Sequence, residues 1–286
     1  AYAFYATTQG HACGALVNAA ALKDTGTSDK IDMVILTYGF NNDQIKKQAA
    51  QINNMTVKEV QHLKQQKTGG ASYYGDVMVK LRVFQLFEYD RVIYMDADMM
   101  VRKNLDHLFL LPETAHFAAP HVYFHPAGSV FCSCFMVFKP TRHMWDRIMG
   151  YYGKDGYVTE DKMYDMNLLI KEFGIEATLL PGIYEMLTSH LISAPEYEKK
   201  LLQYPFMSQK LGMPNRTWEE IYNATSIVHF TGDKPTIERN IATMKRKRPT
   251  ADPRFFAIFE RYYSLAAKVC PSRERYSASN EYTNYF

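Results

Sequence analysis

Residues 91–98 read Arg91-Val92-Ile93-Tyr94-Met95-Asp96-Ala97-Asp98. A short apolar run rich in β-branched and aromatic side chains is typical of a strand buried inside a sheet. In open α/β sheets, ligands bind beyond the carboxyl ends of the strands, and Asp96 and Asp98 follow this run directly. The stretch therefore predicts a central strand that delivers two carboxylates to a binding site.

Apolar runs alternate with segments of helical periodicity on both sides of this strand. Alternation of this kind predicts an α/β fold, with a mostly parallel sheet flanked by helices. One domain is expected over residues 1–270, followed by a loosely held polar tail over 271–286, and the stretch 195–223 has no assigned element. The other expected strands are 3–6, 31–38, 57–63, 130–139, 177–180 and 226–230, and the expected helices are 14–22, 42–52, 76–87, 144–152, 163–173 and 254–269.

The composition indicates a folded globule. Of the 286 residues, 47% are hydrophobic and 22% are charged, which is ample apolar material for a packed core. The 33 basic and 30 acidic side chains give a net charge of +3, too close to balance for a chain that grips nucleic acid through its phosphates. No run reaches the roughly eighteen uninterrupted apolar residues of a membrane helix, so these residues are expected to be soluble.

The four cysteines, Cys13, Cys132, Cys134 and Cys270, are too few for a disulfide scaffold and lack the Cys-x-x-Cys spacing of zinc or redox sites. Small cysteines are commonly buried, so Cys132 and Cys134 are expected to pack in the core. The basic run 245–248 is expected to form a solvated loop without a function.

Three Asn-x-Thr sequons begin at Asn54, Asn215 and Asn223. They favour the lumen of a secretory compartment, because N-glycans are added there. The chain also begins with alanine instead of methionine, which favours a signal or membrane anchor upstream of it. The expected setting is the Golgi lumen, as the catalytic domain of a membrane-anchored protein, with the cytoplasm as the alternative.

Asp96 and Asp98 are one residue apart, so both carboxylates can reach the same ion. Hard oxygen ligands suit Mn²⁺ or Mg²⁺, and substrate phosphates commonly complete the coordination of such ions. The alternative is that the two aspartates only end the strand and begin a turn.

A second strand, within residues 226–230, also ends in polar groups. His229 can supply an imidazole to the same ion, Gly232 lets the backbone approach a phosphate, and Lys234 offers a positive charge to a diphosphate. A structural histidine followed by an ordinary turn is the alternative.

Several segments, in order from residue 1 to about residue 235, resemble the glycogenin-like members of glycosyltransferase family 8. The resemblance implies a GT-A fold, a single nucleotide-binding domain with a Rossmann-like sheet, and transfer of a sugar from a UDP-sugar, with Mn²⁺ and retention of anomeric configuration. The matching segments are Ala3-Phe4-Tyr5-Ala6-Thr7-Thr8 with Gly14-Ala15-Leu16, Val79-Lys80-Leu81-Arg82, Val92-Ile93-Tyr94-Met95-Asp96-Ala97-Asp98, Asn104-Leu105-Asp106-His107-Leu108-Phe109 and His229-Phe230-x-Gly232-x-Lys234-Pro235.

The resemblance also assigns roles to residues. Asp96, Asp98 and His229 are expected to bind the metal. The residues expected to contact the donor are Ala6, Thr8, Gln9, Ala97, Ser133, Gly232 and Lys234, and those expected to take part in catalysis are Lys80, Asp165 and Lys234. For Asp165, the alternative is a helix cap.

The chain departs from the family pattern around the donor sugar. Cys132 stands where those enzymes carry an asparagine, and Met166 stands where they carry a glutamine. Segments 109–112, 164–166 and 179–188 are most similar to a fungal branch that includes Golgi N-acetylglucosaminyltransferases. The expected donor is therefore UDP-GlcNAc, otherwise UDP-Glc or UDP-Gal, and the expected acceptor is a carbohydrate or glycoprotein.

Two other functions compete with transfer. One is a nucleotide-sugar or glycan-binding protein that kept the fold and lost catalytic power. The other is a phosphoryl-transfer enzyme with an Asp-x-Asp motif, which fits less well because Met100 stands where that class carries threonine or valine.

Overall fold

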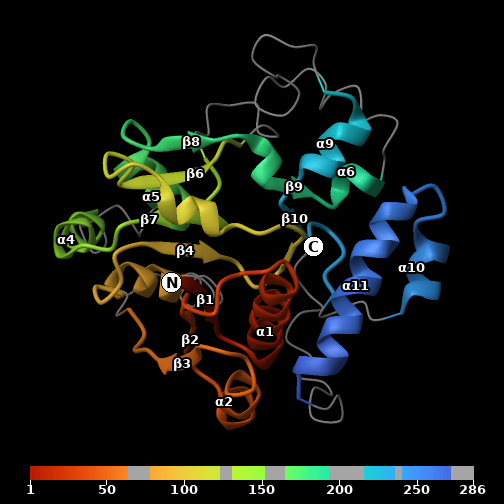
Figure 1. Cartoon of the computed structure of the whole chain (residues 1–286), viewed down its shortest axis with the longest axis horizontal. Coiled ribbons are helices and arrows are strands. Elements are labelled where there is room, and N and C mark those ends of the chain that lie inside the picture. Colours follow the sequence, from red (N-terminus) through yellow and green to blue (C-terminus); the bar gives the residue numbers. More distant parts are fainter. Residues whose placement is uncertain (64–77, 123–130, 152–164, 193–215, 236–239, 272–286) are drawn as a thin grey trace, which may run out of the picture.

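The structure of the chain, a computed structural model, describes residues 1–63, 78–122, 131–151, 165–192, 216–235 and 240–271. A seven-stranded sheet runs through it in the order β3-β2-β1-β4-β7-β6-β8 (Figure 1). The first four of these strands are parallel to one another, and β7 is antiparallel to both β4 and β6. The strands are β1 (Tyr2–Ala6), β2 (Met33–Thr37), β3 (Met55–Glu59), β4 (Val92–Met95), β6 (Phe117–Pro120), β7 (Phe135–Phe138) and β8 (Thr178–Leu180).

The two faces of this sheet form separate cores, because successive residues of a strand point to opposite sides. In β1, Phe4 packs into one core with α1 (Gln9–Asp24) and α11 (Pro253–Val269), whereas Ala3 packs into the other with α4 (Arg142–Tyr151) and α5 (Asp165–Phe173). The predicted α/β class, with a mostly parallel sheet flanked by helices in one domain, is confirmed.

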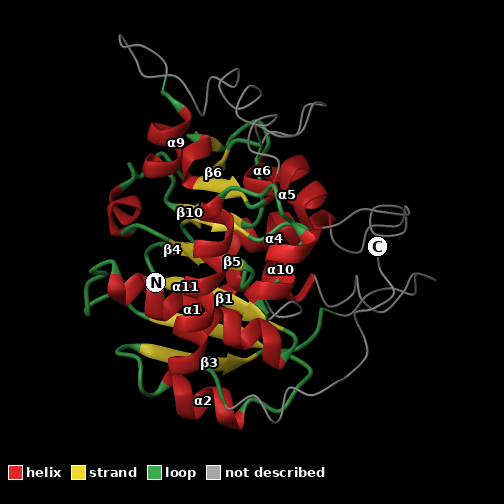
Figure 2. Ribbon diagram, turned by 90° about the vertical axis from the view of Figure 1, so that its right-hand side faces the viewer, coloured by secondary structure: helices red, strands yellow, loops and turns green. Residues whose placement is uncertain are grey.

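A three-stranded sheet in the order β5-β10-β9 lies beside the large one (Figure 2). β10 (Ile227–His229) is antiparallel to β5 (Met99–Val101) and parallel to β9 (Glu185–Leu187). The sequence predicts β10 but neither β5 nor β9. The small sheet matters for the site because β5 begins directly after Asp98.

The remaining elements are short. The expected helix 76–87 is a 3₁₀ helix, η1 (Met78–Gln85), and the unassigned stretch 195–223 contains α9 (Trp218–Ala224), which begins with a capping box of Thr217 and Glu220. Residues 272–286 of the predicted tail lie outside the described ranges. The other elements are α2 (Asp43–Ala49), η2 (Asp106–Leu110), η3 (Gly182–Tyr184), α6 (Ser189–Ile192) and α10 (Ile241–Lys247).

A disulfide joins Cys13 of α1 to Cys270, the residue that ends α11. The sequence analysis does not predict it, because the two cysteines are 257 residues apart. The bond fixes two helices that already pack side by side on the same face of the large sheet (Figure 1). Within the described ranges, no helix combines the length and apolar content needed to cross a bilayer.

Candidate functional site

Strand pairing brings the two predicted metal-binding segments together. His229 of β10 pairs with Met99 of β5, and the amide of Phe230 donates to the carbonyl oxygen of Asp98 at 3.0 Å. The imidazole Nε2 of His229 consequently lies 3.5 Å from Oδ1 of Asp98. The sequence analysis predicts this convergence of His229 with the aspartate pair, and the structure shows it.

Lys234 forms an ion pair with the other carboxylate oxygen of Asp98. Its ammonium is 2.6 Å from Oδ2 of Asp98 and also donates to the carbonyl oxygen of Phe230. Gly232, in the turn between β10 and Lys234, is exposed and has a φ of +81°, a conformation that residues with a Cβ rarely adopt. The turn thus carries an exposed backbone and a lysine next to the predicted metal ligands, as expected for a phosphate-binding segment.

The second half of the site surrounds Lys80, which is only 3% exposed. Its ammonium is 2.6 Å from Oδ2 of Asp165 and 3.4 Å from Oδ1 of Asp96. Ser133 donates from its hydroxyl to Oδ2 of Asp165 at 2.6 Å. The structure therefore joins the predicted catalytic residues Lys80 and Asp165 to Asp96 through one buried ion-pair network.

The two aspartates of the motif have opposite electrostatic surroundings. Burial raises the pKa of Asp96 above its ordinary value, and the charge of Lys80 opposes this only in part. Burial would also raise the pKa of Asp98, but the adjoining His229 and Lys234 outweigh it and lower this pKa far below its ordinary value. Asp98 is thus held as a carboxylate.

The structure also shows two residues that the sequence analysis does not assign. Glu185 is 2% exposed, and its Oε1 lies 2.9 Å from Nδ1 of His229. A carboxylate on one imidazole nitrogen fixes the ring so that the other nitrogen can bind a metal. Tyr94 donates from its hydroxyl to Asp96. A glutamate within the apolar segment 183–187 is the only signal in the sequence that could have pointed to Glu185.

The charge of the cluster suits a divalent cation. Within the described residues, the four carboxylates of Asp96, Asp98, Asp165 and Glu185 face the two ammonium groups of Lys80 and Lys234. A metal-bound imidazole is neutral, so two formal negative charges would remain for the ion to offset. Two aspartates and an imidazole are a donor set for Mn²⁺ or Mg²⁺. These residues fit the expected ion.

A second group of side chains that could bind a metal includes Glu185, the partner of His229. In the described part of the chain, Cys132, Cys134 and Glu185 form a group whose ligand atoms all lie within 4.8 Å of one another. Both cysteines lie in the turn before β7, where their sulfur atoms approach to 2.8 Å. Cys132 is buried, as expected for core packing, whereas Cys134 is half-buried.

The residues expected to hold the nucleotide lie where β1 leads into α1. Ala6 ends the strand, the hydroxyl of Thr8 caps the helix by accepting from the amide of His11, and Gln9 is the first helical residue. The carbonyl oxygen of Ala97 lies in the turn of the aspartate motif that packs against this helix. Their contacts with a nucleotide remain a prediction.

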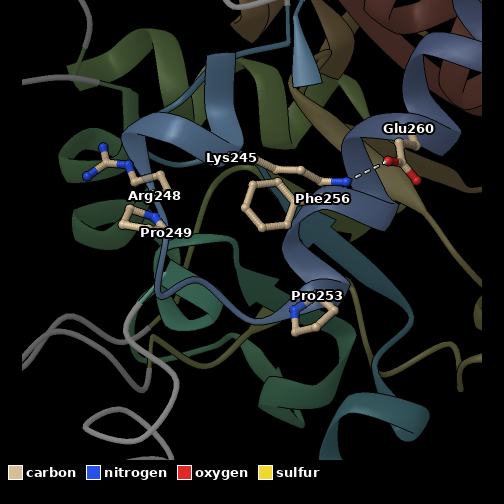
Figure 3. A pocket seen from close by; sticks show the side chains of 6 residues that line it. All are labelled: Lys245, Arg248, Pro249, Pro253, Phe256 and Glu260. Atoms are coloured by element: carbon tan, nitrogen blue, oxygen red, sulfur yellow. Dashed lines mark ion pairs between the residues drawn. The ribbon is translucent and has the colours of Figure 1, made fainter. Parts of the chain in front are cut away.

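A surface pocket of about 460 Å³ lies elsewhere, between α10 and α11, and none of the predicted site residues lines it (Figure 3). Lys245, in the last turn of α10, reaches over the ring of Phe256 towards Glu260, with 3.8 Å between the charged atoms. Arg248 pairs with Asp233 at 3.1 Å. Three of the four basic residues thus belong to the last turn of α10 and are exposed. The run is solvated as expected, but it is the end of a helix and not a loop.

Comparison with solved structures identifies the fold. A galactosyltransferase, LgtC, in complex with donor and acceptor sugar analogs matches 96% of this chain and 98% of its own, with a TM-score of 0.64 and 14% sequence identity. The glycosyltransferase GlyE of Streptococcus pneumoniae matches 96% of this chain and 66% of its own, with a TM-score of 0.56 and 16% identity. At this level of identity the likeness shows the fold alone, and that fold is the predicted GT-A fold.

Curated relatives include fungal proteins, as the segment similarities predict. Glucose N-acetyltransferase 1 of Candida glabrata is 33% identical over 43% of this chain and 26% of its own length. The protein of the same name from Aspergillus fumigatus is 26% identical over 88% of this chain and 68% of its own length. A UDP-glucuronate:xylan alpha-glucuronosyltransferase of Arabidopsis thaliana is 26% identical over 52% of this chain and 22% of its own. The chain thus matches about a quarter of the length of several of these relatives.

The family model described as glycosyl transferase family 8 matches residues 3–235. This range contains the aspartate motif, the Lys80 and Asp165 network and the His229 to Lys234 segment. The chain therefore belongs to glycosyl transferase family 8.

Proposed function

We propose that the chain is a retaining glycosyltransferase that moves a sugar from a UDP-sugar to a glycan or protein-linked acceptor, with Mn²⁺ bound by Asp96, Asp98 and His229. The approach of His229 to Asp98, from a strand 131 residues further along the chain, is the observation that carries the proposal. It is supported by family membership and by the excess of buried negative charge around these side chains. Mg²⁺ is the second candidate for the ion.

The residues of the chain have distinct roles in this proposal. When bound, a divalent ion neutralises the charge that develops on the departing diphosphate. Gly232 lets the backbone approach a phosphate oxygen, and Lys234, now paired with Asp98, provides a second positive charge for the leaving group. Lys80 and Ser133 hold Asp165 in one orientation beside Asp96, where it would face the donor sugar.

UDP-GlcNAc is the donor that we favour, with UDP-Glc and UDP-Gal as alternatives. Cys132 replaces the family asparagine next to Ser133, so this chain contacts the sugar differently from glycogenin-like enzymes. The names of the fungal relatives also refer to glucose and N-acetyl transfer.

The Golgi lumen is the compartment that we propose, for a catalytic domain whose anchor precedes these residues. The Cys13–Cys270 disulfide supports an oxidising compartment. Asn54 and Asn223, which begin two of the sequons, are both exposed as glycosylation requires. The third, Asn215, lies outside the described residues.

A donor-hydrolysis assay tests the function. Purified protein is incubated with UDP-GlcNAc, UDP-Glc, UDP-Gal or UDP-xylose, with Mn²⁺ or with a chelator, and released UDP is measured. We expect Mn²⁺-dependent release, fastest with UDP-GlcNAc, and its loss in Asp98→Ala but not in the control Asp43→Ala, a change at an exposed site on α2. Full turnover in Asp98→Ala would reject the metal site, and tight UDP binding without hydrolysis or transfer would favour the binding-protein alternative. The anomeric configuration of the product, read by NMR, tests retention.

A further inference from the structure

Cys132, Cys134 and Glu185 form a compact group that the proposed transfer reaction does not use. The two cysteines flank Ser133 in the turn before β7, and Glu185 is the first residue of β9. The sulfur atoms of the cysteines are 2.8 Å apart, and Sγ of Cys132 is 3.5 Å from Oε1 of Glu185. Neither cysteine is in a disulfide. Two thiols and a carboxylate thus meet at one point, where Cys132 and Glu185 are buried and Cys134 is half-buried.

The two carboxylate oxygens of Glu185 differ in their contacts. Its Oε1 accepts from His229, whereas its Oε2 is buried and has no hydrogen-bond partner within the described residues. A buried polar atom without a partner costs about 1–3 kcal/mol, and more when it is charged, so native structures seldom keep one without a ligand. The unpaired oxygen is an observation independent of the cysteines, and a cation at this carboxylate would satisfy it.

We propose that Cys132, Cys134 and Glu185 form a second cation site, selective for a thiophilic divalent ion of the Zn²⁺ type. Two thiolates and a carboxylate are zinc ligands, whereas Mn²⁺ and Mg²⁺ prefer oxygen. Binding releases the two thiol protons to solvent. Zinc–sulfur bonds of about 2.3 Å at a tetrahedral angle separate two sulfur atoms by about 3.8 Å, so the sulfurs move apart by about 1 Å on binding. The three side chains leave a fourth position for water.

Glu185 connects this site to the proposed manganese site. Its Oε1 remains on Nδ1 of His229, whose Nε2 faces Asp98. A cation on Oε2 withdraws negative charge from the hydrogen bond that orients His229, and it repels a second divalent ion nearby. Occupation of the cysteine site therefore weakens the binding of the hard ion.

Cobalt spectroscopy tests the site without any assay of turnover. Co²⁺ bound by thiolates has a strong charge-transfer band in the near ultraviolet, whereas Co²⁺ bound by oxygen and nitrogen has only weak visible bands. Protein purified without oxygen is titrated with Co²⁺. We expect a thiolate band that saturates at one ion per chain, disappears in the Cys132→Ser/Cys134→Ser double variant, and needs at least tenfold more Co²⁺ in Glu185→Gln.

Two controls make the result decisive. Asp98→Ala removes a ligand of the proposed manganese site but none of the cysteine site, so the variant should keep the thiolate band. The cobalt test therefore gives its answer even if the proposed transfer function is wrong. Circular dichroism confirms that each variant is folded.

A wild-type titration without the band would overturn the proposal. Thiol titration of the denatured, unreduced protein should count two thiols, and a count of zero would overturn it in favour of a Cys132–Cys134 disulfide.

The antagonism between the sites rests on the proposed function and is measured separately. Zn²⁺ should raise at least tenfold the Mn²⁺ concentration needed for half-maximal UDP release by the wild type. The double cysteine variant should need the same Mn²⁺ concentration with and without Zn²⁺. An equal effect of Zn²⁺ on both proteins would place the competing ion at the aspartates and refute the coupling.

Discussion

Gly14 of α1 lies directly against Ala97, and a Cβ at position 14 would stand 2.2 Å from the carbonyl oxygen of Ala97. One turn later, the side-chain amide of Asn18 donates to the carbonyl oxygen of Met99 at 2.8 Å, and its oxygen accepts from the amide of Val101 at 3.1 Å. The first helix therefore sets the backbone on both sides of Asp98. The position of the proposed metal-binding motif depends on a helix that supplies none of the proposed ligands.

Gly14→Ala should displace the turn that carries Asp96 and Asp98. Overpacking of this kind costs about 1–3 kcal/mol of unfolding free energy, and we expect Mn²⁺ affinity to fall with it. Gly150→Ala in α4 is the matched control, because its Cβ would meet no atom within 4 Å. Chemical denaturation and Mn²⁺ titration measure the two effects, and equal behaviour of the two variants would show that the contact at Ala97 is unimportant.

Lys80→Met should destabilise the protein strongly. It leaves the carboxylates of Asp96 and Asp165 without their buried counter-charge, and breaking a buried ion pair costs about 3–5 kcal/mol. Lys139→Met is the control, since Lys139 pairs with Glu113 on the surface and should contribute less than about 1 kcal/mol. Urea denaturation at neutral pH measures both, and a similar loss in both variants would contradict the buried network.

Glu185→Gln should weaken Mn²⁺ binding without preventing folding. Glutamine keeps the shape of the side chain but removes the negative charge that supports His229, and changes of this type cost about 10–100-fold in metal affinity. Glu172→Gln is the comparison, because Glu172 is also buried and instead pairs with Arg147. Electron paramagnetic resonance of free Mn²⁺ gives the affinities, and we expect a change only at position 185.

His190 should make the protein sensitive to acid. Burial lowers its pKa from 6.5 to about 4, so the folded state keeps the ring neutral where the unfolded state binds a proton. The unfolding free energy should therefore fall as the pH drops from about 6.5 to about 4, by up to about 3 kcal/mol from this residue. Replacement of His190 by glutamine should flatten the pH dependence of urea denaturation, whereas the same change at the exposed His116 should leave it unaltered.

Much of the large sheet is predictable because its strands are short, continuous apolar runs. The runs that become β1, β2 and β4 are recognisable from composition alone, as is the run that becomes β10 of the small sheet. Because Asp98 and His229 each lie at the end of such a run, a common site could be predicted for them. The boundaries are less accurate, since the strand expected at 57–63 is β3, at Met55–Glu59. Tertiary pairing with β2, rather than local preference, sets its register.

The features that escape prediction depend on contacts between distant residues. Glu185 interrupts an apolar segment, and only the folded chain shows that its partner is His229. Cys132 and Cys134 meet Glu185, a residue more than fifty positions further along, and nothing in the local sequence indicates that contact. Sequence spacing shows which residues can share a strand or a helix, but it does not show which side chains meet across separate elements.

The Cys13–Cys270 bond closes residues 13–270 into a covalent ring. A single break in the backbone of this ring, wherever it falls, leaves one connected molecule. New ends can therefore be opened at a surface loop while α1, and the turn of Asp96 and Asp98 that it supports, stay tethered to α11.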